Sequence, residues 1–329
     1  MGLIVSLAAV TVLAIIGLLG ANAPFLFGVI IPYIAIAAFI FGIVYRIVKW
    51  ARSPVPFRIP TTSGQQKSLG WIKQNKLDSP SSTLGVIGRM ALEVLFFRSL
   101  FRNTKTGLKE GKKIVYSEET WLWLGGLIFH WSFLVIFLRH FRFFSDQIPA
   151  FVPALQNIDG FLQVGVPIIY ITNVLIIAAV TFLFLRRLFD SKVRYISLSS
   201  DYFPLLLILG IAVTGILMRY FTKVDLVGIK EMVVGVLTFN PVVKEGISSM
   251  FYIHLFFVCS LLIYFPMSKL VHMPGVFMSP TRNLANNNRM KRHINPWNPH
   301  LHVHTYEEYE DEFRELMIGA GLPVDKEAK

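Results

Sequence analysis

Four of the eight histidines are spaced in a way that suggests chemistry. His130 and His140 lie ten residues apart in one apolar segment, and His254 and His272 lie eighteen apart in a later one. A neutral imidazole is a common metal ligand, and an ionisable side chain within a membrane is costly enough to indicate a function. A single such histidine would more simply hydrogen-bond a nearby carbonyl, but four on two segments favour a shared site.

The segments around these histidines have the composition of membrane spans. The 329 residues are 54% hydrophobic and only 16% charged, and the apolar residues form runs that a soluble domain of this size would not bury. About 20 apolar residues of helix cross a bilayer core. Six runs have this length: 3–19, 25–48, 120–138, 161–185, 202–220 and 250–271. We therefore expect an all-α, polytopic transmembrane helical bundle, although a cleaved or re-entrant segment would look like the first run.

These runs divide the chain into four parts. Residues 1–50 are predicted to form an N-terminal transmembrane hairpin, and 51–119 a basic cytoplasmic segment. Residues 120–272 would form the bundle that carries the four histidines, and 273–329 a cytoplasmic tail. Within the basic segment, 84–101 mixes apolar and charged residues and is expected to lie on the membrane surface as an amphipathic helix.

Positive charge orients the spans. The 51–119 segment holds twelve Lys and Arg residues, whereas the 141–160 loop holds only Arg142. Since Lys and Arg gather on the cytoplasmic side, this distribution places both termini in the cytoplasm of a cell membrane protein with six spans. The formal net charge of +12 is thereby explained by topology and requires no nucleic-acid partner.

The topology also pairs the histidines. The third and sixth spans are antiparallel, so His140 and His254 fall toward the outer side, and His130 and His272 toward the inner side. Along ideal helices the separations would be about 15 Å and about 27 Å, and a bend near Pro266 would reduce the second. Two imidazole pairs at two depths are what two b-type haems need, and with both axial positions filled such haems transfer electrons.

The single cysteine, Cys259, excludes an internal disulfide, a cysteine zinc site and an iron–sulfur cluster held by this chain alone. Any iron–sulfur relay must therefore belong to a partner. The chain also shows no acid–base pair or nucleophile of its own for catalysis, so whether it counts as an enzyme is left open.

The two histidine segments resemble the dihaem membrane subunit of respiratory nitrate reductase, the gamma-subunit family. They read GLIFHWSFLVIFLRHFRFF, with His130 and His140, and FYIHLFFVCSLLIYFPMSKLVH, with His254 and His272. The resemblance covers roughly 120–272. It implies one haem between His140 and His254 on the outer side and a second between His130 and His272 on the inner side.

The N-terminal hairpin, the 51–119 segment and the longer tail depart from that subunit and look like the DsrM family, the haem b subunits of DsrMKJOP complexes in sulfur-metabolising microbes. This likeness implies electron exchange between menaquinol or menaquinone and a cytoplasmic, DsrK-like iron–sulfur subunit related to heterodisulfide reductase. Further subunits similar to DsrJ, DsrO and DsrP, including a periplasmic cytochrome c, would complete such a complex of dissimilatory sulfur metabolism. A related cytochrome complex is the alternative within this resemblance.

Basic side chains near the outer histidines are candidates for binding haem propionates or a quinone head group. Ordinary placement of cations at helix ends explains the same positions. They are Arg139, Arg142, Arg219 and Lys223. We place the quinol site beside His140 on this side.

Other polar residues have simpler explanations. Tyr170 and Asn173 would lie in the fourth span and are expected to serve helix packing. Met218 and Met278 are packing residues rather than haem ligands. The alternating His300, His302 and His304 could line a metal site, but without an acidic residue among them a surface for a partner is favoured.

Two functions of other classes remain open. One is a transporter whose intramembrane histidines relay protons, which would normally show internal repeats or broken helices. The other is a membrane anchor without haem. Neither explains why the four histidines fall on only two spans.

Overall fold

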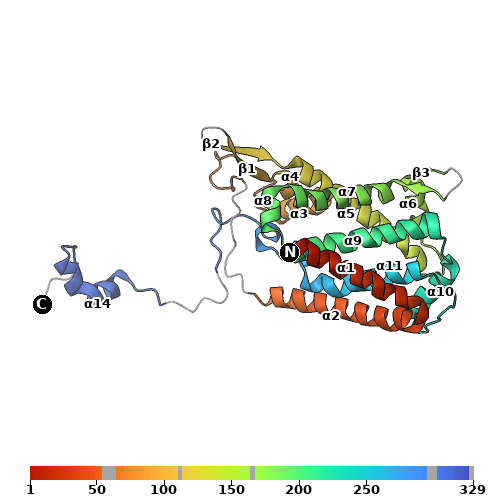
Figure 1. Ribbon diagram of the computed structural model, residues 1–329. Coiled ribbons are helices and arrows are strands. Elements are labelled where there is room, and N and C mark those ends of the chain that lie inside the picture. Colours follow the sequence, from red (N-terminus) through yellow and green to blue (C-terminus); the bar gives the residue numbers. More distant parts are fainter. Residues whose placement is uncertain (54–63, 110–112, 164–166, 295–301, 326–329) are drawn as a thin grey trace.

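A computed structural model describes residues 1–53, 64–109, 113–163, 167–294 and 302–325. Figure 1 shows a bundle of long helices, with the N-terminus and the β1–β2 hairpin at one end and α10 and β3 at the other. We call these ends the β1–β2 end and the α10 end. The predicted all-α fold with six membrane-spanning helices is confirmed.

The six spans are continuous or nearly continuous helices. They comprise α1 (Gly2–Leu18) with η1 (Leu19–Asn22), η2 (Leu26–Ile30) with α2 (Ile31–Ala51), α5 (Thr120–Arg139) with η3 (His140–Phe143), α7 (Ile171–Phe189), α9 (Ser199–Leu217) with η4 (Met218–Thr222), and α11 (Ser249–Tyr264) with η5 (Phe265–Met267). Their outward faces carry exposed apolar side chains such as Ile4 and Phe41, as expected for surfaces that contact lipid.

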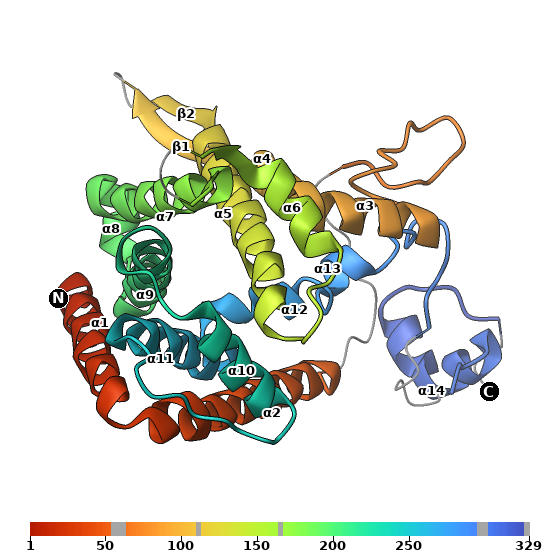
Figure 2. The same ribbon diagram turned by 90° about the vertical axis from the view of Figure 1, so that its right-hand side faces the viewer.

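Helix α11 contacts three other spans. It packs against α1, α2 and α9, while α7 packs between α5 and α9 (Figure 2). The contact with α1 depends on small residues, because a Cβ atom added at Gly17 would lie 2.8 Å from Ile253 Cα. The N-terminal hairpin is therefore packed directly on the helix that carries His254.

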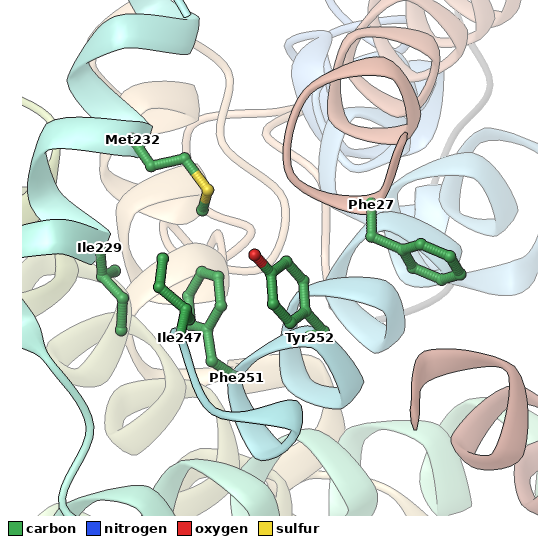
Figure 3. Close-up of a cluster of buried hydrophobic side chains, with 6 residues drawn as sticks. All are labelled: Phe27, Ile229, Met232, Ile247, Phe251 and Tyr252. Carbon is green, nitrogen blue, oxygen red and sulfur yellow. The ribbon is translucent and has the colours of Figure 1, made fainter. Parts of the chain in front are cut away.

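A cluster of buried apolar residues closes the α10 end (Figure 3). It joins η2, α10 (Leu226–Leu237) and the start of α11 through side chains that are at most 7% exposed. Its members are Phe27, Ile229, Met232, Ile247, Phe251 and Tyr252. The cluster fixes α10, which lies between the fifth and sixth predicted spans, over the first turn of α11.

Two predicted spans were wrong at their ends. The fourth was expected over 161–185, but β3 (Gly160–Leu162) pairs antiparallel with β4 (Ile169–Tyr170) and α7 begins only at Ile171. Pro167 disfavours a helix at the preceding residue, and an apolar run alone does not distinguish a strand from a helix. The sixth was expected over 250–271, but α11 ends at Tyr264, just before Pro266.

Several elements outside the spans were not predicted. They are β1 (Thr104–Lys109), β2 (Lys113–Glu118), α6 (Phe151–Asp159), α8 (Ser191–Ile196), η6 (Lys269–Val271), α12 (His272–Gly275), α13 (Pro280–Asn283) and α14 (Tyr306–Gly319), in addition to α10. The expected amphipathic helix over 84–101 is present as α3 (Thr83–Phe96) and α4 (Arg98–Phe101). Phe97, with φ of 50°, separates the two.

A polar cluster joins the segment before the bundle to the segment after it. Arg89 of α3, only 4% exposed, donates hydrogen bonds to the carbonyls of Asp78, Arg282 and Leu284. Burial alone would raise the pKa of Asp78, but hydrogen bonds from Arg102 and Arg98 lower it below its ordinary value. The Asp78 carboxylate therefore stays charged at neutral pH. We call residues 64–102 with 279–286 the polar platform.

We predict that Arg89→Leu increases local unfolding of both segments of the polar platform, 64–102 and 279–286, at the same time. The substitution leaves three carbonyls without this donor, at a cost of about 1–3 kcal/mol for each one that stays unsatisfied away from water. In hydrogen-exchange mass spectrometry of the full chain, 78–102 and 282–286 should exchange about 10-fold faster or more. The exposed Arg52 is the matched control as Arg52→Leu. Faster exchange confined to α3 would contradict the linkage.

Candidate functional site

The structure brings His140 together with His254. His140 is the first residue of η3, directly after α5 ends at Arg139, and His254 lies in the second turn of α11. The two ring centroids are 6.4 Å apart and the ring planes differ by only 7°. This pair lies toward the α10 end, because η3 contacts α10.

His130 lies beside His272 at a second level of the bundle. Their ring centroids are 5.9 Å apart and the planes are nearly perpendicular, at 83°. His130 lies within α5, whereas His272 opens α12 after the short helices η5 and η6. The chain therefore leaves α11 before it reaches His272, so no single helix carries both His254 and His272. The separation of about 27 Å along one ideal helix does not apply to this pair.

Each of the four imidazoles uses its Nδ1 atom within the protein. Nδ1 of His130 lies 2.7 Å from Gly126 O, Nδ1 of His140 lies 2.7 Å from Ile136 O, and Nδ1 of His272 lies 3.0 Å from Lys269 O. A carbonyl only accepts hydrogen bonds, so these Nδ1 atoms carry the proton when the rings are neutral. Their Nε2 atoms then keep a free lone pair.

His254 also carries its proton on Nδ1, but its hydrogen-bond partner is a side chain that sequence analysis missed. Its Nδ1 lies 2.9 Å from Thr214 Oγ1. The Thr214 hydroxyl donates to the carbonyl of Gly210 at 2.8 Å, so its oxygen accepts from His254. A hydroxyl in an otherwise apolar helix was the only signal for this role. Such a partner fixes the ring orientation of a metal-binding histidine.

The ring separations fit a metal held between two imidazoles. A metal–nitrogen bond of about 2 Å on each side, with about 1 Å from each nitrogen to its ring centre, places the centroids about 6 Å apart. Both observed separations, 6.4 Å and 5.9 Å, have this size. None of the four rings is fully covered by protein, and His254 faces the backbone of Gly215, where an added Cβ would lie 3.4 Å from Cε1. The donor set, on rings that protein does not cover completely, is suited to a bis-imidazole haem.

Arg139 is held in a buried network next to His140. Its guanidinium forms an ion pair with Asp159 at 3.1 Å and donates to Thr172 Oγ1 and Asn173 Oδ1. Arg139 and Asp159 are 7% and 6% exposed. Asp159 was missed by sequence analysis, because a lone carboxylate next to Gln156 and Asn157 gives no spacing that points to Arg139. The Nε–H of Arg139 is buried and has no acceptor among the described residues.

Tyr170 lies between two guanidinium groups in the same network. Arg139 Cζ lies 3.8 Å and Arg219 Cζ 4.3 Å from the centre of its ring, a cation–π arrangement on a desolvated tyrosine. Asn173 also donates to Tyr220 at 3.2 Å. Tyr170 caps α7 rather than lying within the span, and this network links α5, α7 and η4 near His140.

Arg142 lies elsewhere, at the edge of a cavity of about 660 Å³ between η3 and α10. The cavity also holds the charged side chains of Lys230 and Glu231 and apolar walls from both elements. Lys223, with φ of 41°, is exposed and belongs to neither the cavity nor the Arg139 network as described. Of the four basic residues grouped from the sequence, Arg139 and Arg219 thus share the network around Tyr170, whereas Arg142 and Lys223 lie elsewhere.

The remaining candidate residues are two sulfur-containing side chains and the histidines of the tail. Met218 packs against the buried cluster of the α10 end, and Cys259 is a buried free thiol. His300 lies outside the described residues. Metal-ligand atoms of His302, His304 and Glu308 lie within 4.8 Å of one another, but all three residues are exposed and the Glu308 carboxylate already accepts from Thr305 N–H at the start of α14.

Comparison with known proteins agrees with this arrangement. The profile of the nitrate reductase gamma subunit family matches residues 89–293, which include all four histidines. An "Hdr-like menaquinol oxidoreductase cytochrome b-like subunit" of Archaeoglobus fulgidus is 48% identical over 281 residues, which are 83% of this chain and 84% of the relative. Its namesake from Archaeoglobus profundus is 45% identical over 276 residues, 82% of each chain.

The relatives span most of this chain, and the family profile covers both spans that carry the histidine pairs. Together with the six apolar helices, these matches show that the chain is a multi-pass membrane protein and belongs to the nitrate reductase gamma-subunit family.

Proposed function

We propose that this chain is a dihaem cytochrome b subunit that transfers electrons between menaquinol and a cytoplasmic iron–sulfur partner. His140 with His254 would hold one b-type haem, and His130 with His272 the second. When bound, the two haems supply one-electron redox centres at two depths of the membrane. The observation that carries this proposal is the pair of imidazole separations, each close to what an intervening iron requires.

The residues around the pairs support haem binding. All four Nδ1 atoms have hydrogen-bond partners, so the Nε2 atoms are left as ligands. The buried Nε–H of Arg139, next to His140, is available to a carboxylate such as a haem propionate. Asp159 balances the charge of this arginine and keeps it in place when no propionate is present.

The cavity beside η3 supports a quinol site near the His140–His254 pair. Its apolar walls suit a naphthoquinone ring, and Arg142 and Lys230 offer donors to the quinone oxygens. By the distribution of Lys and Arg, the α10 end would face the outside and the β1–β2 end the cytoplasm. Oxidation of menaquinol there would release its two protons outside while its two electrons move inward. The two relatives are named as menaquinol oxidoreductase subunits.

A cytoplasmic partner would dock at the β1–β2 end. The polar platform lies beside the His130–His272 pair, since the ring of Phe97, between α3 and α4, contacts the ring of His130 with centroids 4.8 Å apart. The word Hdr-like in the names of the relatives supports a partner related to heterodisulfide reductase. We propose a DsrK-like iron–sulfur subunit and a place in dissimilatory sulfur metabolism, with DsrJ-, DsrO- and DsrP-like subunits in the same complex.

Single histidine substitutions test the assignment of the two haems. His140→Ala and His254→Ala should each remove the same haem, and His130→Ala and His272→Ala the other, because each iron loses one axial ligand. Low-temperature reduced-minus-oxidised spectra with pyridine haemochrome quantitation identify which haem is lost. If His130→Ala and His254→Ala remove the same haem, the pairing is wrong.

Substitution of Arg142 tests the quinol site. Arg142→Gln removes a charged donor from the cavity and should raise the concentration of reduced naphthoquinol needed for half-maximal haem reduction by about 10-fold. Haem content should not change. Arg194→Gln, an exposed position of α8 at the other end of the bundle, is the matched control. An unchanged quinol dependence in Arg142→Gln would place the site elsewhere.

A further inference from the structure

We infer that the N-terminal hairpin, which lies outside the residues matched by the family profile, is a positioning element for His272. One face of α2 contacts the bend between α11 and α12 and thereby sets the place of this histidine opposite His130. The inference deepens the proposed function and rests on it, because it concerns the haem assigned to the His130–His272 pair.

The contact is made by residues that recur every three or four positions along α2. Phe39, Gly42, Arg46 and Trp50 therefore lie on one helical face. Phe39 packs edge-on against Phe265, with ring centroids 5.6 Å apart. At Gly42 the helices approach so closely that an added Cβ would lie 2.6 Å from Pro266 Cβ. Any larger side chain at this position must displace the bend.

Polar and aromatic contacts extend the same face. Arg46 Nε donates to Pro266 O at 2.8 Å, which supplies a partner to a carbonyl at the point where α11 has ended. One turn further along, the Trp50 ring lies 3.5 Å from the Cβ position of Gly275, the last residue of α12. Helix α2 thus contacts the chain on both sides of His272.

The bend needs such support because it holds His272 without a continuous helix. Pro266 ends the ladder of α11, and His272 is reached through η5 and η6. Within this turn, the carbonyl of Lys269 is the acceptor for His272 Nδ1, and the Lys269 ammonium pairs with Asp201 at 2.8 Å. The orientation of the imidazole therefore follows the position of the 265–271 turn, one side of which is fixed by α9 and the other by α2.

Gly42→Val tests this inference in the full chain. The added side chain should displace the bend and weaken binding of the haem at His130–His272 by about 10-fold or more, the loss typical when the support of a metal ligand is removed. The haem-to-protein ratio should fall from two toward one, and the remaining spectrum should match that of His272→Ala. Arg46→Met, which loses the donor to Pro266 O, should act in the same direction, and Arg46→Lys should retain more of the haem.

Phe41→Ala is the control, since Phe41 is next to Gly42 but 74% exposed on the lipid-facing side of α2. Full retention of both haems in Gly42→Val and Arg46→Met, with unchanged potentials, would overturn the inference. Loss of the haem at His140–His254 instead, or an equal loss in Phe41→Ala, would also overturn it. Absence of haem b from the wild-type chain would contradict the proposed function itself, so the two failures are distinguishable.

Discussion

The hydrogen bond at Nδ1 of each imidazole is the interaction on which the site depends. Inside a bilayer no water is present to satisfy a histidine, and an unpaired polar group costs several kcal/mol. Within the spans, the chain meets this cost with a helix carbonyl for His130 and His140 and with the Thr214 hydroxyl for His254. Beyond the end of the sixth span, a turn carbonyl is the partner of His272. The same bonds fix which nitrogen is left to bind a metal. The hydrogen bonds that stabilise the four rings therefore also leave Nε2 as the atom that would bind a metal.

Much of this arrangement was predictable from the sequence. The six spans and the two histidine pairs followed from apolar run length and from the antiparallel order of the third and sixth spans, because membrane thickness restricts both strongly. The ends of the spans were less predictable. Pro167 and Pro266 change the path of the chain within runs that are mainly apolar, and apolarity alone does not show this.

The partners of His254 and Arg139 were not predictable for a different reason. Thr214 and Asp159 act through partners that are distant in sequence, and a single hydroxyl or carboxylate in an apolar stretch gives no spacing to interpret. The sequence offered Arg139 as a ligand for a haem propionate or a quinone head group, or as an ordinary cation at a helix end. In the structure Asp159 pairs with that arginine, and its buried Nε–H has no acceptor among the described residues.

The structure also connects the parts that surround the bundle to the two histidine levels. The N-terminal hairpin packs on α11 and on the bend before His272, and the polar platform reaches His130 through Phe97. If each histidine pair holds one haem, the purified wild-type chain contains two b-type haems. Pyridine haemochrome quantitation, referred to protein mass, measures this ratio directly. Two haems per chain are expected, and a chain without haem b, or with only one haem at saturation, would contradict the two-haem arrangement.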